Sequence, residues 1–166
     1  PYGVTKLAGE HLCNLYARNY GVPTVALRYF TVYGPRQRPD MAIHRLVEAA
    51  IRQLPFKIYG DGEQVRDFTF VDDVVEANLL AATADIEPGL VLNVSGGASI
   101  TMNALIKLVG HAVGQSVIVE PGAAKPGDVR RTGGTTELAN KLLGWFPRHE
   151  ISSGLKTQVE WHRNRT

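Results

Sequence analysis

Apolar residues recur with helical spacing along several segments of the chain. Between residues 2 and 20 this spacing predicts an amphipathic helix, whose recurring apolar positions are Val4, Ala8, Leu12 and Leu15. Gly21 and Pro23 follow at once, and both residue types commonly end a helix. A second helix is expected over residues 41–53, with one apolar face formed by Ile43, Leu46, Val47, Ala50 and Ile51.

Short runs of apolar and β-branched residues lie between the helical segments and predict strands. They are "TVALRYF", "FKIYG", "VRDFTFV", "GLVLNVSGG" and "SVIVEP". Helices are expected after the third and fourth runs, with Asp72 or Asp73 and then Thr101 as the capping residues, and again near 136–143 and 152–163. The segment "TVYGPRQRPD" is expected to be a loop. Strands that alternate with helices predict an α/β fold with a largely parallel sheet.

Composition and charge narrow the classes of protein. The 166 residues suffice for one domain, and 44% hydrophobic with 20% charged residues is ordinary for a globular protein. The apolar runs are too short for a membrane span, and the net charge of +2 forms no basic stripe, so neither a membrane nor a nucleic acid is an expected partner. The single cysteine, Cys13, rules out an internal disulfide and favours a cytoplasmic location. The scattered histidines predict no metal site.

Tyr2 and Lys6 lie four residues apart at the start of the first predicted helix, so they share one face of it. A tyrosine phenol ordinarily has a pKa of about 10 and is a poor base at neutral pH, but a neighbouring ammonium favours its ionised form. With its pKa lowered in this way, Tyr2 would be a general base able to take a proton from a hydroxyl, such as that of a sugar, while hydride leaves the same carbon. Taken alone, such a pair also fits an ordinary surface helix.

Two phosphate-binding motifs are missing from the sequence. No G-x-G-x-x-G follows a strand near the first residues, and no G-x-x-x-x-G-K-[ST] is present. The glycines of "GDG" and "SGGAS" are expected in turns. These residues therefore offer no phosphate loop for a dinucleotide.

The tyrosine–lysine pair belongs to a longer series of motifs. Five segments appear in order along the chain: "PYGVTKLAGEHL", "RYFTVYGPRQRPDMA", "IYGDGEQVRDFTFVDDVVEA", "LNVSGG" and "PGDV". In these segments and their order, almost the whole chain resembles the extended short-chain dehydrogenase/reductase family of sugar-nucleotide epimerases and dehydratases. The resemblance implies the C-terminal part of a Rossmann-type parallel sheet plus the smaller mixed α/β sugar-nucleotide-binding domain. Residues 1–33 would end the NAD-binding domain, and 34–166 would mainly form the substrate domain, with about 66–97 returning to the first.

The same resemblance implies NAD as the cofactor, a UDP-sugar as the substrate and a homodimer when the protein is intact. The N-terminal half of such a protein carries the dinucleotide loop and would be missing. The chain alone is therefore expected to be inactive and to bind NAD negligibly.

Four residues are implied to act at the cofactor. Tyr2 would be the catalytic base, and Lys6 would bind the nicotinamide ribose and help the phenol to ionise. Tyr29 and Phe30 would lie by the nicotinamide, because they end a strand and ligands of open α/β sheets bind at the carboxyl ends of strands. Packing in the core is the alternative role for their side chains.

The segment "RYFTVYGPRQRPDMA" is most similar to UDP-glucuronate 4-epimerases. UDP-glucose epimerases and UDP-glucuronate decarboxylases usually have asparagine at the position of Thr31. A threonine hydroxyl can donate to a sugar carboxylate and leaves room for it. Arg38 would hold that carboxylate, so that a 4-keto intermediate keeps its CO₂, although solvent exposure in a polar loop is the alternative.

The remaining predicted contacts belong to the nucleotide. Arg66 would grip the diphosphate, since a planar guanidinium suits paired phosphate oxygens, with pairing to Asp67 or Asp72 as the alternative. The other predicted substrate-binding residues are Arg45 near the phosphates, Lys57 and Tyr59 near the uracil, and Lys125 and Asp128 in a loop that closes on the nucleotide.

Together these residues predict an NAD-dependent epimerase that inverts C4 of a UDP-sugar through a 4-keto intermediate. UDP-glucuronate, converted to UDP-galacturonate, is the expected substrate. The alternatives are a UDP-glucose 4-epimerase, a UDP-glucuronate decarboxylase and, from another class, a nucleotide-sugar-binding module without catalysis.

Overall fold

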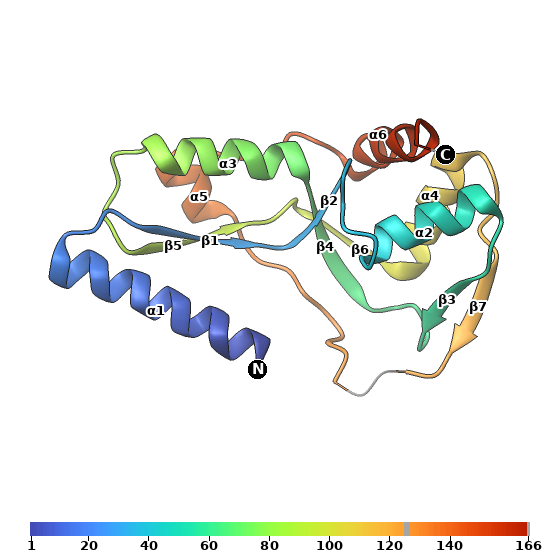
Figure 1. Ribbon diagram of the computed structural model, residues 1–166, viewed down its shortest axis with the longest axis horizontal. Helices are drawn as coiled ribbons and strands as arrows, with labels where there is room; N and C mark the ends of the chain where they lie inside the picture. Colours follow the sequence, from blue (N-terminus) through green and yellow to red (C-terminus); the bar gives the residue numbers. More distant parts are fainter. Residues whose placement is uncertain (125–126, 166) are drawn as a thin grey trace.

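The computed structural model of the chain describes residues 1–124 and 127–165. Within these residues, six helices and seven strands form two packed halves that lie side by side along the longest axis (Figure 1). Three of the four strand pairs in this part of the chain are parallel, so the predicted α/β fold is confirmed. The strands form three small sheets, however, and not the single sheet that was expected.

One half, which we call the α1 half, is built on two parallel strands. Its elements are α1 (Tyr2–Tyr20), β1 (Val25–Tyr29), α3 (Val71–Thr83), β5 (Leu90–Val94) and α5 (Glu137–Leu143). β1 and β5 pair in a register that places Val25 beside Leu90 and Tyr29 beside Val94. Figure 1 shows α3 and α5 on one face of the strands and α1 on the other. The buried core comprises Val74, Ala77, Leu92, Val94, Ala139, Leu143 and Trp145.

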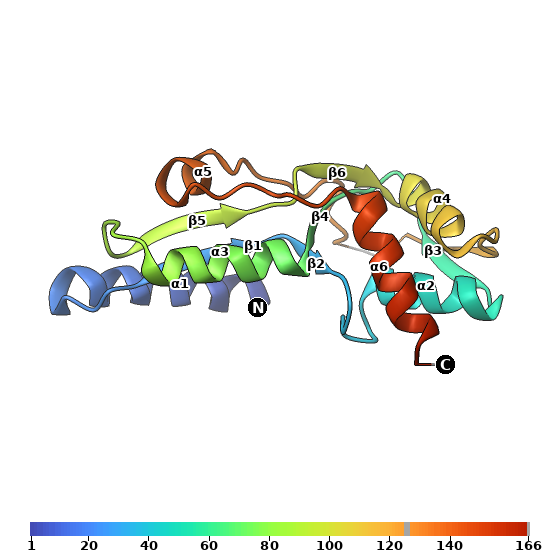
Figure 2. The same ribbon diagram turned by 90° about the horizontal axis from the view of Figure 1, so that it is seen from above.

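The other half, the α2 half, contains the remaining elements. They are β2 (Thr31–Tyr33), α2 (Ala42–Arg52), β3 (Phe56–Tyr59), β4 (Val65–Phe70), β6 (Ala98–Thr101), α4 (Met102–Val113), β7 (Val119–Gly122) and α6 (Ile151–Arg163). β4 lies between β2, to which it is parallel, and β6, to which it is antiparallel, while β3 pairs with β7. Figure 2 shows α2, α4 and α6 grouped at one end of the molecule, where they pack against one another.

The helices predicted from apolar spacing are present, and their ends follow the predicted chemistry in two places. Gly21 ends α1 in the left-handed conformation, with a φ of 67°. Thr101 caps α4, because its side chain accepts a hydrogen bond from the Ala104 amide at 3.1 Å. No helix in the described part of the chain is long and apolar enough to cross a membrane.

Two short strands and one cap differ from the prediction. β2 lies inside the segment expected to be a loop, and β6 follows directly after the glycines of "SGGAS". Gly96 is required there by a close approach: a Cβ atom at this position would overlap the carbonyl oxygen of Phe68 on β4. The predicted cap by Asp72 or Asp73 is wrong, because α3 begins at Val71 and both carboxylates fall in its first turn.

Asp73 instead joins the two halves. Its side chain is 1% exposed and accepts hydrogen bonds from the backbone amides of Arg148 and His149, both at 3.2 Å. The His149 ring donates to the same carboxylate through Nδ1 at 2.8 Å. A carboxylate in the first turn of α3 therefore fixes the segment that leads into α6.

Helix α1 is attached to the rest of the molecule by polar contacts more than by apolar packing. Ala17 is its one buried residue in the structure as described. Arg28 donates two hydrogen bonds to Glu10, at 2.7 and 2.6 Å, and the hydrogen bond from Arg28 lowers the pKa of that carboxyl. Asn14 donates to the carbonyl of Gly89 at 3.1 Å, so α1 is held along β1 and beside the turn before β5.

Candidate active site

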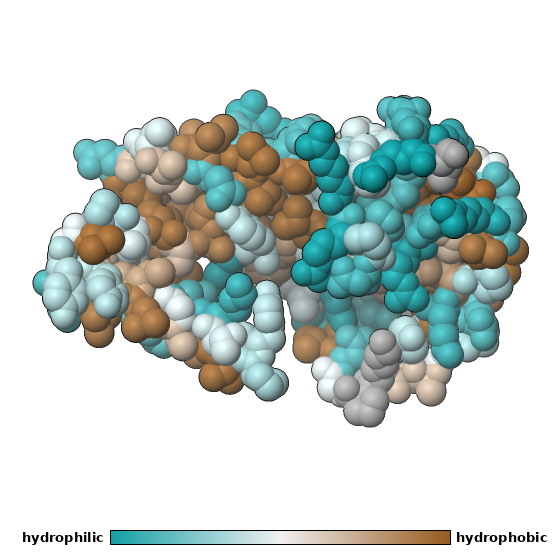
Figure 3. Space-filling model, viewed as in Figure 1, coloured by the Kyte–Doolittle hydropathy of each residue, from teal (hydrophilic) through white to brown (hydrophobic). Residues whose placement is uncertain are grey.

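A cleft of about 570 Å³ opens between the start of α1 and the α2 half. Its walls come from three places: the first turn of α1, the corner between β1 and β2, and the loop that follows β2. Of the predicted site residues it brings together Tyr2, Tyr29, Phe30, Thr31 and Arg38. Figure 3 shows the surface notched between the N-terminal end of α1 and the α2 half.

Tyr2 and Lys6 lie close together on one face of α1, as their spacing predicts. The ammonium nitrogen of Lys6 is 5.5 Å from the centre of the Tyr2 ring. Tyr2 is 76% exposed, so the phenol stands at the open side of the cleft with room for a ligand beside it. The geometry places a hydroxyl and a cation together where a polar ligand can reach both.

The corner between β1 and β2 sets the inner wall of the cleft. Tyr29 ends β1, and its hydroxyl donates to the side-chain oxygen of Asn78 on α3 at 2.7 Å. Phe30 packs against Gly134, where an added Cβ would lie 2.6 Å from the ring. Neither side chain belongs to either buried core, since Tyr29 is exposed and Phe30 is half-buried. Both side chains therefore line the cleft and do not pack in a buried core.

Arg38 and Asp40 form an exposed ion pair at the rim of the cleft. Arg38 donates to the Asp40 carboxylate through Nε at 3.0 Å and through Nη2 at 2.8 Å. Asp40, and more weakly the nearby Tyr2, raise the pKa of Arg38, while the hydrogen bond from Arg38 lowers the pKa of Asp40. The guanidinium is thus both solvent-exposed and beside the same cleft as the phenol.

A second, smaller cleft of about 270 Å³ begins on the other side of Thr31. The predicted nucleotide contacts Arg45, Lys57, Tyr59 and Arg66 line it, and Thr31 lines both clefts. The two clefts therefore adjoin at Thr31, with Tyr2 lining one and Arg66 lining the other. Lys125, another predicted contact, lies outside the residues that the structure describes.

Arg66 pairs with Asp128 and not with its neighbours. Its Nη2 donates to the Asp128 carboxylate at 2.5 Å, and its side chain is only 19% exposed. The alternative pairing with Asp67 or Asp72 is not found among the described ion pairs. Alternation along β4 turns Asp67 to the other face, where it is buried and accepts a hydrogen bond from the Gly96 amide at 2.9 Å.

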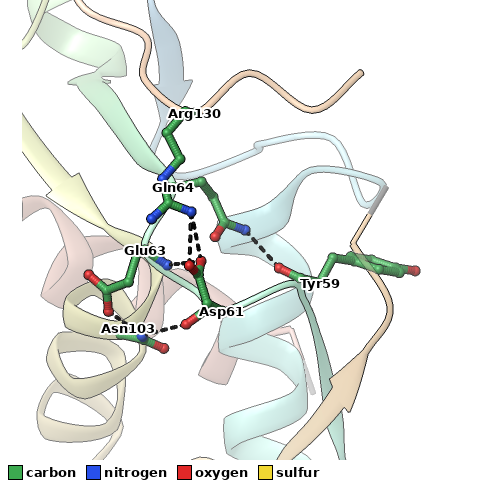
Figure 4. A network of polar contacts seen from close by, with 6 residues as sticks. All are labelled: Tyr59, Asp61, Glu63, Gln64, Asn103 and Arg130. Carbon is green, nitrogen blue, oxygen red and sulfur yellow. Dashed lines mark hydrogen bonds and ion pairs between the residues drawn. The ribbon is translucent and has the colours of Figure 1, made fainter. Parts of the chain in front are cut away.

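A polar network holds the segment that carries Asp128 in place (Figure 4). Arg130 donates to both oxygens of the Asp61 carboxylate, at 3.1 and 2.9 Å. The Glu63 amide also donates to Asp61, and these contacts lower the pKa of that carboxyl. Asn103 on α4 donates to the Asp61 carbonyl at 3.0 Å and to the Glu63 carboxylate at 2.6 Å. The turn after β3 thereby ties the loop to α4.

Two buried groups in or beside the larger cleft were not predicted from the sequence. Tyr33 lines the larger cleft and is 1% exposed, and its hydroxyl has no hydrogen-bond partner among the residues that the structure describes. Burial raises the pKa of Tyr33, with Asp73 adding to the effect. Gln158, from α6, is also fully buried and accepts a hydrogen bond from the Gly34 amide at 2.9 Å. A lone tyrosine or glutamine in a helix or loop gives no sequence pattern that would have found either role.

The model of the NAD dependent epimerase/dehydratase family matches residues 1–95 of the chain. The chain belongs to this family. It is 37% identical to the UDP-glucuronate 4-epimerase of Thermodesulfobacterium geofontis, over 98% of this chain and 50% of that protein.

Solved structures of epimerases have the same fold as this epimerase/dehydratase chain. The Bacillus cereus UDP-glucuronic acid 4-epimerase, in complex with UDP-glucuronic acid and NAD, is 39% identical with a TM-score of 0.94, and the match covers 100% of this chain and 53% of that one. The Thermotoga maritima UDP-glucose 4-epimerase with UDP-glucose is 38% identical with a TM-score of 0.91, covering 99% and 54%. The chain thus spans about half the length of the relatives it matches.

Proposed function

We propose that this chain supplies the acid–base pair and the nucleotide-binding cleft of an NAD-dependent UDP-sugar 4-epimerase that acts on UDP-glucuronate. The observation that carries the proposal is the pair of clefts that adjoin at Thr31, with Tyr2 lining one and Arg66 lining the other. A sugar beside the phenol and a diphosphate beside the guanidinium would occupy the two clefts in the order in which a nucleotide sugar links them. The family membership and the UDP-sugar complexes of similar proteins support this assignment.

The residues at the open side of the larger cleft fit a nicotinamide riboside. Lys6 offers a cation and Tyr2 a hydroxyl, both of which can hold ribose oxygens, while the half-buried Phe30 offers an apolar wall. When bound, NAD supplies the chemistry of accepting hydride from C4 and returning it. We propose that residues 1–33 and about 66–97 belong with the cofactor, and that most of 34–166 belongs with the substrate.

Tyr2 would take the proton from the C4 hydroxyl as the carbon is oxidised, and return it after the sugar has turned over. The ammonium of Lys6 favours the phenolate because opposite charges attract more strongly once a ligand excludes water. The distance of 5.5 Å between the Lys6 ammonium nitrogen and the centre of the Tyr2 ring supports this role. The phenol thus holds and releases one proton in each cycle, with no net consumption.

Thr31 and Arg38 would hold the C5 carboxylate of the sugar. A 4-keto uronic acid is a β-keto acid, which loses CO₂ when its carboxylate turns perpendicular to the carbonyl plane. A hydroxyl donor on the inner wall and a guanidinium on the rim can restrain that rotation from two sides. Binding would require Arg38 to exchange part of its exposed contact with Asp40 for the substrate.

At the nucleotide end, the diphosphate would compete with Asp128 for the guanidinium of Arg66. Arg45 would add charge from α2, and Lys57 and Tyr59 would lie along the uracil. We propose that Lys125, three residues before Asp128 in the sequence, also contacts the nucleotide.

The proposal is tested by incubating the complete gene product with UDP-glucuronate and NAD and identifying the nucleotide products. UDP-galacturonate is expected. A pentose nucleotide with CO₂ would instead identify a decarboxylase, and turnover of UDP-glucose alone would identify a UDP-glucose 4-epimerase. A protein that binds UDP-sugars and converts none of them would contradict the proposed function.

A further inference from the structure

A cavity separate from the two clefts lies beside the loop that follows β2. The larger of those clefts, which contains Tyr2 and Thr31, is called the sugar cleft. The separate cavity has a volume of about 450 Å³ and is formed between α2, α6 and the loop. Arg36, Gln37 and Arg38 line this cavity and the sugar cleft as well, so the loop is the wall between them. Its other walls include Ile51, Arg52 and Trp161. We call it the rear cavity.

Positive charge dominates the rear cavity. Four arginines, 36, 38, 52 and 165, line it against the single carboxylate of Glu48. Glu48 pairs with Arg52 at 3.2 Å, and Arg38 pairs with Asp40 outside the cavity. Among the ion pairs of the described residues, neither Arg36 nor Arg165 has a carboxylate partner. Uncompensated guanidinium groups beside apolar walls favour an anionic ligand.

An aromatic wall completes the rear cavity. The rings of His44, Trp161 and His162 meet edge to face, with centres 4.5 to 6.1 Å apart. The guanidinium of Arg165 lies 4.7 Å from the Trp161 ring, close enough for a cation–π contact. Small-molecule sites typically have volumes of about 300–1,000 Å³ with mostly apolar walls and a few polar groups, which this cavity matches. The chemistry suits a planar ring that carries a phosphate.

A chain of buried amides connects the rear cavity to the sugar cleft. Gln158 lies one turn before Trp161 on α6, and its Nε2 donates to the side-chain oxygen of Gln37 at 3.0 Å. Its own side-chain oxygen accepts from the Gly34 amide at 2.9 Å. Gln37 in turn donates to the carbonyl of Val32 at 2.8 Å. Gln37 also directly precedes Arg38 in the loop that lines both cavities. Movement of α6 would therefore be transmitted to the loop after β2, which lines the sugar cleft.

The backbone of the shared loop is also unusual. Arg36 has a φ of 66°, in the left-handed region that residues other than glycine rarely adopt. Such a conformation costs energy and persists where the surroundings enforce it. A loop held in this way, between two cavities, can take up a second arrangement when one cavity is filled.

We propose that the rear cavity is a ligand site for a small phosphorylated ring compound, and that its occupancy changes the affinity of the sugar cleft through Arg38. The site goes beyond the proposed catalysis, because a cleft for nucleotide and sugar exists without it. The ring lies against Trp161, and the phosphate binds the guanidinium groups of Arg36 and Arg165. Coupling is reciprocal, so a nucleotide sugar in its own cleft changes the affinity of the rear cavity by the same factor.

The test uses the complete gene product with phenyl phosphate as the probe and indole fluorescence as the readout. Trp161 reports on the rear cavity, whereas Trp145 is fully buried in the other half and serves as the internal reference. We expect a saturable change in emission that is absent in the variant Trp161→Phe. Inorganic phosphate lacks the ring and phenol lacks the charge, so both should bind at least about tenfold more weakly.

Variants separate the rear cavity from general surface charge. Arg165→Gln removes one of the two arginines without a carboxylate partner and should weaken phenyl phosphate binding roughly tenfold. Lys156→Gln, at an exposed position of α6 that does not line the cavity, is the matched control and should bind as the unmodified protein does. Equal binding by Arg165→Gln and Lys156→Gln, or no saturable change at all, would overturn the site.

A competition experiment distinguishes this site from the catalytic one. With saturating UDP-glucuronate, whose sugar would reach Arg38, phenyl phosphate should still bind, with an affinity shifted at least twofold; complete displacement would show that both occupy one site and would overturn the proposal. Binding with no shift would retain the site and overturn the coupling. A failure of UDP-glucuronate itself to bind would count against the proposed function, while the fluorescence of Trp161 would still decide the rear cavity.

Discussion

The two halves of the molecule differ in how completely they bury their apolar side chains. The α2 half packs three helices on two sheets, and Ile43, Leu46, Val47 and Leu105 are fully shielded from solvent. In the α1 half, helix α1 exposes Tyr2, Val4, Leu7, Leu12, Leu15, Tyr16 and Tyr20. Figure 3 shows the contrast: broad apolar areas cover the α1 half, whereas the surface over α2 and α6 is mostly hydrophilic.

This difference separates two tasks. The half that would hold the nucleotide is a closed unit whose cleft is shaped by its own core. The half that bears Tyr2 and Lys6 presents them on a helix with apolar residues on several sides, a pattern typical of a helix covered by further protein. Binding of the nucleotide should therefore depend on the α2 half, and turnover on what surrounds α1.

The largest expected effect comes from the phenol in the open half. In the complete gene product, Tyr2→Phe should lower turnover of UDP-glucuronate by about 10²–10⁴-fold, the usual contribution of a positioned general base. Affinity for UDP should stay unchanged, because the nucleotide cleft lies in the α2 half. Tyr20→Phe, at the exposed far end of the same helix, is the control. Full turnover by the Tyr2 variant, measured by product formation, would break the proposed division of tasks.

A core substitution tests whether the α2 half is the closed one. Leu46 is completely buried on α2, so Leu46→Ala should lower the free energy of unfolding by about 2–5 kcal/mol, as is usual for a leucine truncated in a packed core. Leu54→Ala alters a half-exposed leucine of the same half and should stay within about 0.5 kcal/mol. Urea denaturation of both variants gives the comparison. Similar losses for the two would show that the core packing described for this half does not carry its stability.

The junction between the halves depends on Asp73. Asp73→Ala would leave the amides of Arg148 and His149 without their acceptor in a buried place, which should cost about 1–3 kcal/mol. The exposed Asp72, one residue earlier, is the matched control, because it lies in the same first turn of α3 but makes none of these contacts. If Asp72→Ala were as destabilising as Asp73→Ala, the effect would come from charge at the start of α3 and not from the junction.

Sequence patterns predicted those features that depend on neighbouring residues. The spacing of Leu46 and its companions identified the buried face of α2, and Thr101 identified the start of α4. Most of the site residues predicted from the motifs line one or the other of two adjoining clefts.

What the sequence could not predict depends on contacts across the chain. Asp73 was expected to cap its own helix, but it binds amides 75 and 76 residues away. Asp128 lies 62 residues from Arg66, and the sequence offered only the nearby Asp67 and Asp72 as partners for that guanidinium. The rear cavity is likewise assembled from α2, α6 and a loop that no local pattern relates to one another.

The smallest expected effect concerns the closed half and the pH of the solution. Burial lowers the pKa of His162, an effect to which His44 and Arg165 add and which the hydrogen bond to the Gln158 carbonyl and the charge of Glu48 oppose. A histidine that resists protonation when folded binds protons more readily in the unfolded chain, so acidification favours unfolding. The loss of stability should begin as the pH falls below about 6.5, the ordinary histidine value, and continue until the lowered pKa of the folded state is reached.

The free energy of unfolding, measured at pH 7.5 and 5.5, should therefore fall less in His162→Gln than in the unmodified protein. His111→Gln, on the exposed side of α4, should leave the pH dependence as it is; an unchanged slope in His162→Gln would mean that the packing of α6 against α2 does not control this ring.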